Sequence, residues 1–241
     1  MGVIWTSKTR TRQPQRVVGI DWGHPASARL VAAFLPVVSG RGYDFASQSI
    51  GRSHYGNLDN FAPGRFGSPF ASTTTSDDLY SEQPARVITQ FTITSVVLLR
   101  ANPSSKMTIF AGNTTGPALH LKINTNGTVE VLIRDYPSGD VDKFFTTTPT
   151  VPIGRLVVVT ATVTSNFTLS VFFNGDRVFV QEAAVAGFQY GSKILTAVGP
   201  RDYNSPTYPA STIDVYGVFA NEVALSDAVV GGVGDNPWQL F

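Results

Sequence analysis

The chain of 241 residues contains no cysteine. This absence excludes disulfide bonds, thiolate metal sites and cysteine nucleophiles, so apolar burial must hold the fold together. No stretch approaches eighteen consecutive apolar residues, and the first twenty residues have no apolar segment behind a basic start. We therefore expect neither a membrane span nor a secretory signal, and a protein made in a reducing cytosol.

Histidine is also scarce, with three residues in the whole chain. None of them shows a spacing such as His-x-x-x-His, which two metal ligands on one helix face would need. His120 alternates with Leu119 and Leu121, and this alternation predicts that it lies on the polar, solvent-facing side of a strand. We therefore expect a surface histidine at position 120.

Basic residues are concentrated at the N-terminus, although the net charge is only +1. Four of them precede the first acidic residue, Asp21, and acidic residues outnumber basic ones in the rest of the chain. Residues 1–20 also lack hydrophobic periodicity, so we interpret them as a basic arm that is ordered by a partner. The arm lacks interleaved aromatic residues, and we expect a protein partner rather than nucleic acid. Its predicted attachment residues are Trp5, Lys8, Arg10, Arg12 and Arg16.

The composition favours strands and turns, with fifteen prolines, twenty-two glycines and abundant threonine, valine and phenylalanine. Residues 156–163 and the second half of residues 91–99 are apolar on both faces, as in buried strands, while residues 119–123 and 129–133 form a predicted hairpin. Residues 194–198 form a further short strand. Residues 29–34 fit either a buried strand or one helical turn.

The clearest turn signal is Asn174-Gly175. Apolar residues alternate before it from Phe167 to Phe173, and Val178 and Val180 follow it. Asn-Gly supplies the two positive-φ residues of a tight hairpin, so we predict two antiparallel strands joined at this position.

Two segments near the C-terminus carry a family resemblance. Residues 212–219 (TIDVYGVF) run into residues 224–230 (ALSDAVV), and this order after an Asn-Gly hairpin resembles the end of laminin-G-like domains of the concanavalin A-like superfamily. Residues 235–241 (DNPWQLF) and the opening VVGIDWGHPASARLVAAFLP are similar to the two ends of bacteriophage virion proteins that carry this domain.

The resemblance implies an all-β fold, a two-sheet antiparallel jelly-roll sandwich over residues 21–234. The N-terminal arm of residues 1–20 precedes it, and a C-terminal tail of residues 235–241 follows it. We expect Gly231, Gly232 and Gly234 to let this tail move. Trp238 and Phe241 are predicted attachment residues that pack either on the chain's own sandwich beside Trp22 or on a neighbouring subunit.

The function that the resemblance implies is that of a non-enzymatic structural protein on the exterior of a bacteriophage virion, made in the host cytoplasm. Its partners would be major capsid or tail proteins and further copies of the chain. The alternative is a host-surface glycan-binding module of the adsorption machinery. An inactive or divergent polysaccharide-cleaving enzyme is a third alternative.

The superfamily also contains glucanases, whose two catalytic carboxylates lie on one strand face in a Glu-x-Asp-x-Glu pattern. This chain has four glutamates, and none of them begins that pattern: Glu82, Glu130, Glu182 and Glu222. We therefore expect no glycoside hydrolysis by this mechanism.

Two further groups of residues are candidates for binding. Loop tyrosines beside polar residues could stack on a sugar, although such tyrosines are equally typical of protein interfaces; these candidate glycan-binding residues are Tyr136, Tyr190, Tyr203 and Tyr208. No cofactor is expected, but laminin-G-like domains often bind Ca²⁺ through loop carboxylates. The calcium candidates are Asp77, Asp78, Asp140 and Asp142, for which turn capping is the competing interpretation.

Overall fold

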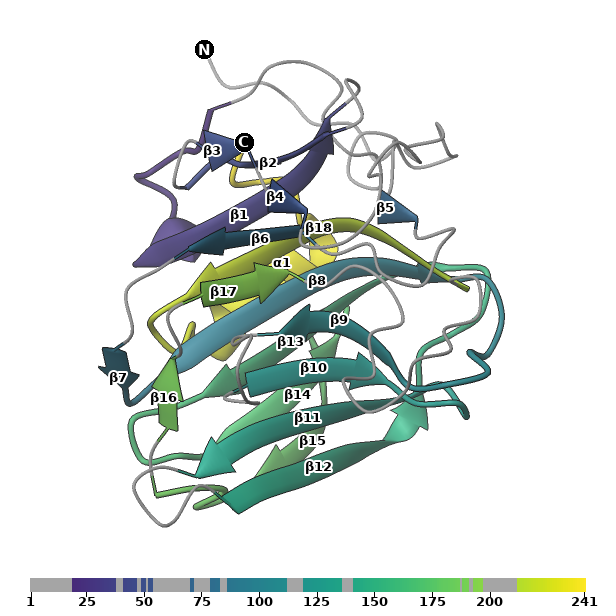
Figure 1. Cartoon of the computed structure of the whole chain (residues 1–241). Helices are drawn as coiled ribbons and strands as arrows, with labels where there is room; N and C mark the ends of the chain where they lie inside the picture. The colour runs from purple at the N-terminus through teal and green to yellow at the C-terminus, as the bar shows by residue number, and fades with distance from the viewer. Residues whose placement is uncertain are drawn as a thin grey trace.

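The computed structural model describes residues 19–37, 41–46, 49–50, 52–53, 70–71, 79–82, 86–111, 119–135, 141–186, 188–190, 193–196 and 212–241. These residues form two antiparallel sheets that face each other, with one short helix on the outside of the larger sheet (Figure 1). The predicted all-β two-sheet sandwich is therefore confirmed.

The larger sheet has nine strands. Its order is β15 (Asp176–Gln181), β14 (Leu169–Phe173), β13 (Leu156–Val163), β8 (Phe91–Leu99), β18 (Ile213–Asn221), β1 (Leu30–Val37), β2 (Arg41–Asp44) and β3 (Ser49–Ile50), and β5 (Phe70–Ala71) also pairs with β18. Neighbouring strands along this order are often distant in sequence, so the sheet ties the two ends of the described chain together.

The second sheet has seven strands. Its order is β12 (Val141–Thr150), β11 (Thr128–Asp135), β10 (Leu119–Ile123), β9 (Met107–Ala111), β17 (Lys193–Thr196), β6 (Leu79–Glu82) and β4 (Arg52–Ser53). A separate pair is formed by β16 (Phe188–Tyr190) and β7 (Arg86–Ile88), and the helices are η1 (Pro25–Ser27) and α1 (Asp227–Asp235).

The strands predicted from apolar patterns are present. β8 and β13 are almost wholly buried and pair with each other, as their two apolar faces require. β10 and β11 form the predicted hairpin, and β17 covers most of the predicted strand at 194–198. Residues 30–37 are a strand, so the strand alternative for this segment is the correct one.

The Asn174-Gly175 hairpin is also confirmed. Asn174 has a φ of 51° and Gly175 a φ of 85°, the positive values that a tight hairpin between β14 and β15 needs. The Asn174 side chain adds a second function, because its Oδ1 accepts a hydrogen bond from the Val158 backbone at 2.9 Å. The turn is thereby fixed to β13 as well.

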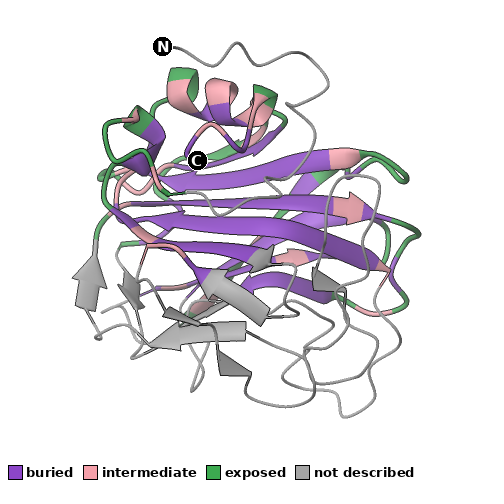
Figure 2. Cartoon of the chain, turned by 90° about the horizontal axis from the view of Figure 1, so that it is seen from above, coloured by how far each residue is buried: buried purple, intermediate pink, exposed green. Residues whose placement is uncertain are grey.

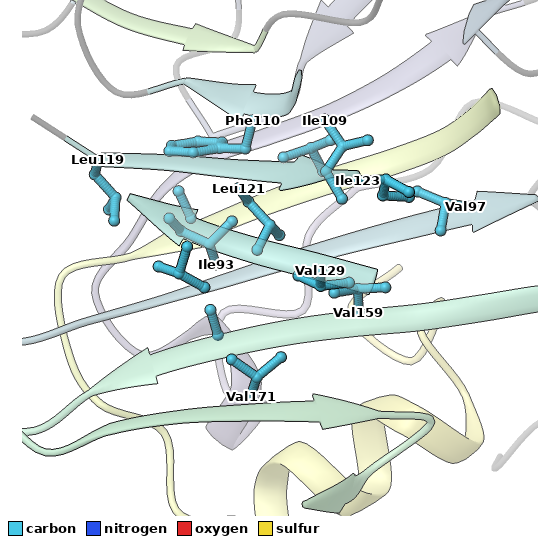
Figure 3. Close-up of a cluster of buried hydrophobic side chains, with 14 of the residues drawn as sticks. Ile93, Val97, Ile109, Phe110, Leu119, Leu121, Ile123, Val129, Val159 and Val171 are labelled. Carbon is cyan, nitrogen blue, oxygen red and sulfur yellow. The ribbon is translucent and has the colours of Figure 1, made fainter. Parts of the chain in front are cut away.

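The main hydrophobic core lies between the two sheets (Figure 3). Alternate residues of β8, β13 and β14 enter it from the larger sheet, and alternate residues of β10 and β11 enter it from the smaller one. Representative members are Ile93, Val97, Leu121, Val129 and Val171. Because every second side chain of a strand points into this layer, the intervening side chains must lie on the outer faces of the sandwich.

A second apolar cluster lies on the outer face of the nine-stranded sheet, under α1 and the C-terminal residues (Figure 2). A bulge between Val215 and Gly217 inserts one residue into β18. It places Tyr216 and Phe219 in this outer cluster, while Val215 and Val218 stay in the core between the sheets. The irregularity thus lets one strand supply both layers.

The backbone of helix α1 packs directly against the backbone of the β14–β15 hairpin. A Cβ added to Gly234 would lie 2.2 Å from the Asn174 carbonyl carbon and from the Gly175 nitrogen, and one added to Gly175 would lie 2.8 Å from the Gly231 Cα. An ion pair between Arg177 and Asp227 closes the same contact. The expectation that Gly231, Gly232 and Gly234 let the tail move is therefore wrong, because all three lie within α1 and Gly234 permits its close packing.

The C-terminal residues pack on the chain's own sandwich. Trp238 is 1% exposed and meets the Phe219 ring edge-on at 6.4 Å between centroids, and Phe241 lies 5.5 Å from the Phe45 ring. The Asp21 backbone N–H donates to the Leu240 carbonyl at 2.7 Å, which places the tail beside the opening segment. Of the two alternatives for the tail, packing on the chain's own sandwich is therefore the one found, and an attachment role for Trp238 and Phe241 stays a prediction.

Candidate functional site

The outer face of the seven-stranded sheet differs in character from the cluster under α1. Leu119, Leu121 and Ile123 point into the core, so the intervening side chains of β10 point outward. The same argument applies to β9, β11 and β12. The outward-pointing residues of these four strands, here named the β9–β12 outer face, are Thr108, His120, Lys122, Glu130, Leu132, Arg134, Asp142, Phe144 and Thr146.

The strand register arranges these residues in three rows across the sheet. Asp142 lies opposite Arg134 in the first row. Phe144 lies opposite Leu132, which lies opposite His120, in the second row. The third row runs from β12 to β9 and contains Thr146, Glu130, Lys122 and Thr108. Directly opposed side chains on one face are close enough to interact, so each row acts as a unit.

Glu130 of the third row forms an ion pair with a residue next to the row. Lys106, just before β9, donates from its ammonium to Glu130 Oε2 at 2.7 Å. The Glu130 side chain is only 6% exposed, whereas that of Lys106 is 46% exposed. The other carboxylate oxygen, Oε1, is buried and accepts no hydrogen bond from the described part of the chain. Among the described residues, this acceptor of the row therefore has hydrogen-bonding capacity that is not used.

The first row contains a second ion pair, which is more open to solvent. The Arg134 Nε donates to Asp142 Oδ1 at 2.9 Å, and both side chains are about one-third exposed. The contact holds the planar guanidinium of Arg134 beside the Asp142 carboxylate. A ligand would find donors and acceptors fixed in position beside each other at this end of the face.

His120 does not lie at the surface as expected. It is 2% exposed, and burial, helped by the nearby charges of Lys122 and Arg134, lowers its pKa from 6.5 to about 3. The alternation with leucines identified the outward face correctly, but outward-pointing residues in the centre of this sheet are themselves covered. His120 is consequently a neutral, buried group at neutral pH.

Phe144 is the exposed aromatic residue of the face. Its neighbour Phe145 packs against the main core, so Phe144 must point to the opposite side of the strand, where it is 56% exposed. β12 has only one partner strand in its sheet, β11, and its outer edge carries Phe144 between Asp142 and Thr146. The arrangement combines a flat apolar ring with polar groups on either side.

The two carboxylates of this face are not arranged as a catalytic pair. Glu130 and Asp142 belong to the third and the first row, which are separated by four residues along β11. At about 3.4 Å per residue this corresponds to about 14 Å. Glycosidases place their two carboxyl groups about 5 to 9.5 Å apart. The face therefore suits binding better than this form of hydrolysis.

Most of the residues predicted to bind a partner, a glycan or calcium lie outside the described residues. This group comprises Trp5, Lys8, Arg10, Arg12, Arg16, Asp77, Asp78, Tyr136, Asp140, Tyr203 and Tyr208, and their roles stay predictions. Tyr190 belongs to β16, which lies near β11, but its side chain is not described. Asp142 is described and forms the ion pair with Arg134.

The described residues contain no group of three His, Asp or Glu side chains that could hold a metal ion. They also contain no helix long and apolar enough to cross a membrane. Calcium binding stays a prediction, since the other three candidate aspartates lie outside the described ranges.

Sequence reasoning missed Phe144, although a signal was present. Two adjacent phenylalanines on one strand must point to opposite faces, so one of Phe144 and Phe145 had to leave the core. The pairing of Glu130 with Lys106 had no comparable signal, because Lys106 lies just before β9, Glu130 lies on β11, and the two are 24 positions apart.

No family model and no curated protein matches the sequence. Among solved structures, the binding domain of Paraclostridial Mosquitocidal Protein 1 is similar, with a TM-score of 0.65, 11% identity, and 86% of this chain and 52% of that one covered. The ligand binding domain of botulinum neurotoxin serotype D, in complex with N-acetylneuraminic acid, is similar with a TM-score of 0.64 and 13% identity, and the match covers 88% of this chain and 52% of that one. Trypanosoma rangeli sialidase is similar with a TM-score of 0.62 and 12% identity, and the match covers 97% of this chain and 37% of that one.

This chain thus spans about half the length of the two binding domains. At these identities the likeness concerns the fold alone. The chain has a two-sheet β-sandwich that is shared with binding domains of bacterial toxins and with part of a sialidase.

Proposed function

We propose that this chain is a non-enzymatic, lectin-like module that binds a glycan on the β9–β12 outer face. The observation that carries the proposal is the Phe144 ring, which is exposed on an edge strand beside the Arg134–Asp142 ion pair. Sugar rings have apolar faces and polar rims, so they are bound by an aromatic ring for stacking and by fixed hydrogen-bonding groups around it. Phe144, Arg134 and Asp142 supply this combination.

Two further observations support the proposal. The structures with the same fold include a toxin ligand binding domain in complex with N-acetylneuraminic acid. The separation of Glu130 and Asp142 across two rows argues against hydrolysis by a carboxylate pair. Binding without cleavage is the activity that fits both.

Glycan binding is tested with a broad array of bacterial and host glycans and the purified full chain. Phe144→Ala should weaken binding by about tenfold or more, because stacking and the burial of the ring are lost. Phe144→Tyr keeps a flat ring and should retain most of the binding. Val180→Ala is the matched control, since Val180 is also about half exposed but lies on β15 of the other sheet. Equal binding by the Phe144→Ala variant and the wild type would contradict this assignment.

We further propose that the module is displayed on the exterior of a bacteriophage particle, attached to capsid or tail proteins by residues 1–20, with oligomerisation of the chain. The opening and closing segments, on which the resemblance to virion proteins rests, pack against each other through the Asp21–Leu240 hydrogen bond. Deletion of residues 1–16 should abolish incorporation into particles and leave the melting temperature nearly unchanged. Labelled antibodies on intact particles measure incorporation, and unchanged labelling would contradict the attachment role.

A further inference from the structure

We propose that the β9–β12 outer face selects an uncharged glycan and that Glu130 accepts a hydrogen bond from one of its hydroxyl groups. The inference rests on the proposed glycan binding and names the class of ligand. It follows from the position of one carboxylate oxygen, from the open end of its row and from the charges around it.

The carboxylate oxygen is Oε1 of Glu130. The other oxygen, Oε2, is engaged with the Lys106 ammonium at 2.7 Å, whereas Oε1 is buried and has no partner in the described part of the chain. A carboxylate that is paired with an ammonium group can only accept hydrogen bonds. The group that complements Oε1 is therefore a donor, and the hydroxyl groups of a glycan are donors.

The row of Glu130 opens to solvent at its β12 end. Thr146 lies directly opposite Glu130 and is exposed, because β12 is the edge strand of the sheet. The Phe144 ring belongs to the next row, two residues along the same strand, which is a separation of about 7 Å. A glycan stacked on Phe144 can thus extend past Thr146 and bring a hydroxyl group to Glu130.

Three cations (Lys106, Lys122 and Arg134) and two carboxylates (Glu130 and Asp142) lie on or beside the face, so an acidic sugar meets little net positive charge there. Both carboxylates already lie in ion pairs, Glu130 with Lys106 and Asp142 with Arg134. Lys122 lies opposite Glu130 in the same row, so a ligand carboxylate or sulfate drawn to Lys122 would also meet the Glu130 carboxylate. His120 adds no positive charge, because burial lowers its pKa to about 3. The expected ligand thus differs in charge from the N-acetylneuraminic acid in the toxin complex.

The experiment measures binding of the full chain to two sets of glycans, one uncharged and one bearing sialic acid, uronic acid or sulfate. The wild type should bind members of the uncharged set. Glu130→Gln should weaken that binding at least about tenfold, the factor expected when a hydrogen bond to a charged group is lost. Glu222→Gln is the matched control, since Glu222 is equally buried and is paired with the exposed Arg29, but lies at the end of β18.

A second test variant changes an exposed residue, so it avoids the risk that a substitution at a buried position unfolds the protein. Thr146→Lys places a long side chain at the open end of the row, where the wild-type residue is exposed, and should fold normally and block binding. Thermal unfolding of all three variants checks that they are folded.

The outcomes separate the two proposals. Binding of the acidic set that depends on Phe144 would overturn the present inference and leave glycan binding intact. Binding of the uncharged set that is unaffected by Glu130→Gln and Thr146→Lys would also overturn it. Absence of binding to both sets would refute the proposed function itself.

Discussion

The two outer faces of this sandwich carry different kinds of side chains. The outer face of the nine-stranded sheet carries Tyr216 and Phe219 and is sealed by α1 and Trp238. The β9–β12 outer face instead carries two ion pairs and the exposed Phe144 ring. Apolar residues on an outer face require a cover, and the C-terminal segment supplies it on one side of the molecule. The comparison indicates that one face supplies stability, and we propose that the other supplies recognition.

The difference can be tested first at the residue that seals the apolar face. Trp238→Ala should lower the free energy of unfolding by about 3 to 5 kcal/mol, because it leaves a large cavity between α1 and the sheet. Trp22→Ala is the control, since Trp22 is 58% exposed and its removal should change stability by less than about 0.5 kcal/mol. Urea unfolding measures the free energy of unfolding of both variants. Similar values for the two variants would show that the tail does not seal this face.

We expect the next largest loss of stability from a substitution at the contact between α1 and the β14–β15 hairpin. Gly234→Ala should cost about 3 kcal/mol, because the new methyl group would lie 2.2 Å from backbone atoms that cannot move independently. Gly231→Ala, three residues earlier in the helix, meets nothing within 4 Å. It should be neutral or stabilise by up to about 1 kcal/mol through helix propensity. A neutral Gly234→Ala variant would mean that α1 is not held against the hairpin.

The β9–β12 outer face predicts a pH effect centred on His120. Burial lowers the pKa of His120 from 6.5 to about 3, so the unfolded chain binds a proton that the folded chain does not. The part of the free energy of unfolding that is linked to His120 is therefore fully present above pH 6.5. It is lost as the pH falls towards 3, by about 1.4 kcal/mol per pH unit. His120→Gln should remove this part of the slope. Urea unfolding at pH 4 to 7 measures the free energy of unfolding of the wild type and of His120→Gln, and the difference between them isolates the contribution of His120. If the two free energies changed in parallel with pH, the burial of His120 as a neutral group would be contradicted.

Sequence patterns predicted those parts of the fold that are determined locally. Asn174-Gly175 specifies a tight turn through its own backbone preferences, and the two apolar faces of residues 91–99 specify a strand buried on both sides. The family resemblance rests on residues 212–219 and 224–230, where the structure has β18 and the first turn of α1. Such features depend on neighbouring residues, so the sequence alone suffices to recognise them.

The remaining features depend on contacts between distant residues. The glycines of α1 indicated mobility when considered alone, but they lie within a helix, and Gly234 is required there because it meets Asn174 and Gly175. The burial of His120 depends on what covers the centre of the sheet, and the alternation within its own strand could not reveal it. The candidate binding residues were sought among loop tyrosines, whereas the face described here rests on strand residues brought together by the register of β9 to β12.

The central claim is that the polar outer face binds a ligand and the apolar one does not. Its most direct test is a map of backbone amide chemical shifts during titration with a glycan that the array identifies as bound. We expect the perturbed amides to cluster at residues 142–146 on β12 and at Glu130 to Arg134 on β11, with little change in α1. Perturbations centred on α1 and the C-terminal segment, or absent from β11 and β12 at saturating glycan, would contradict the account.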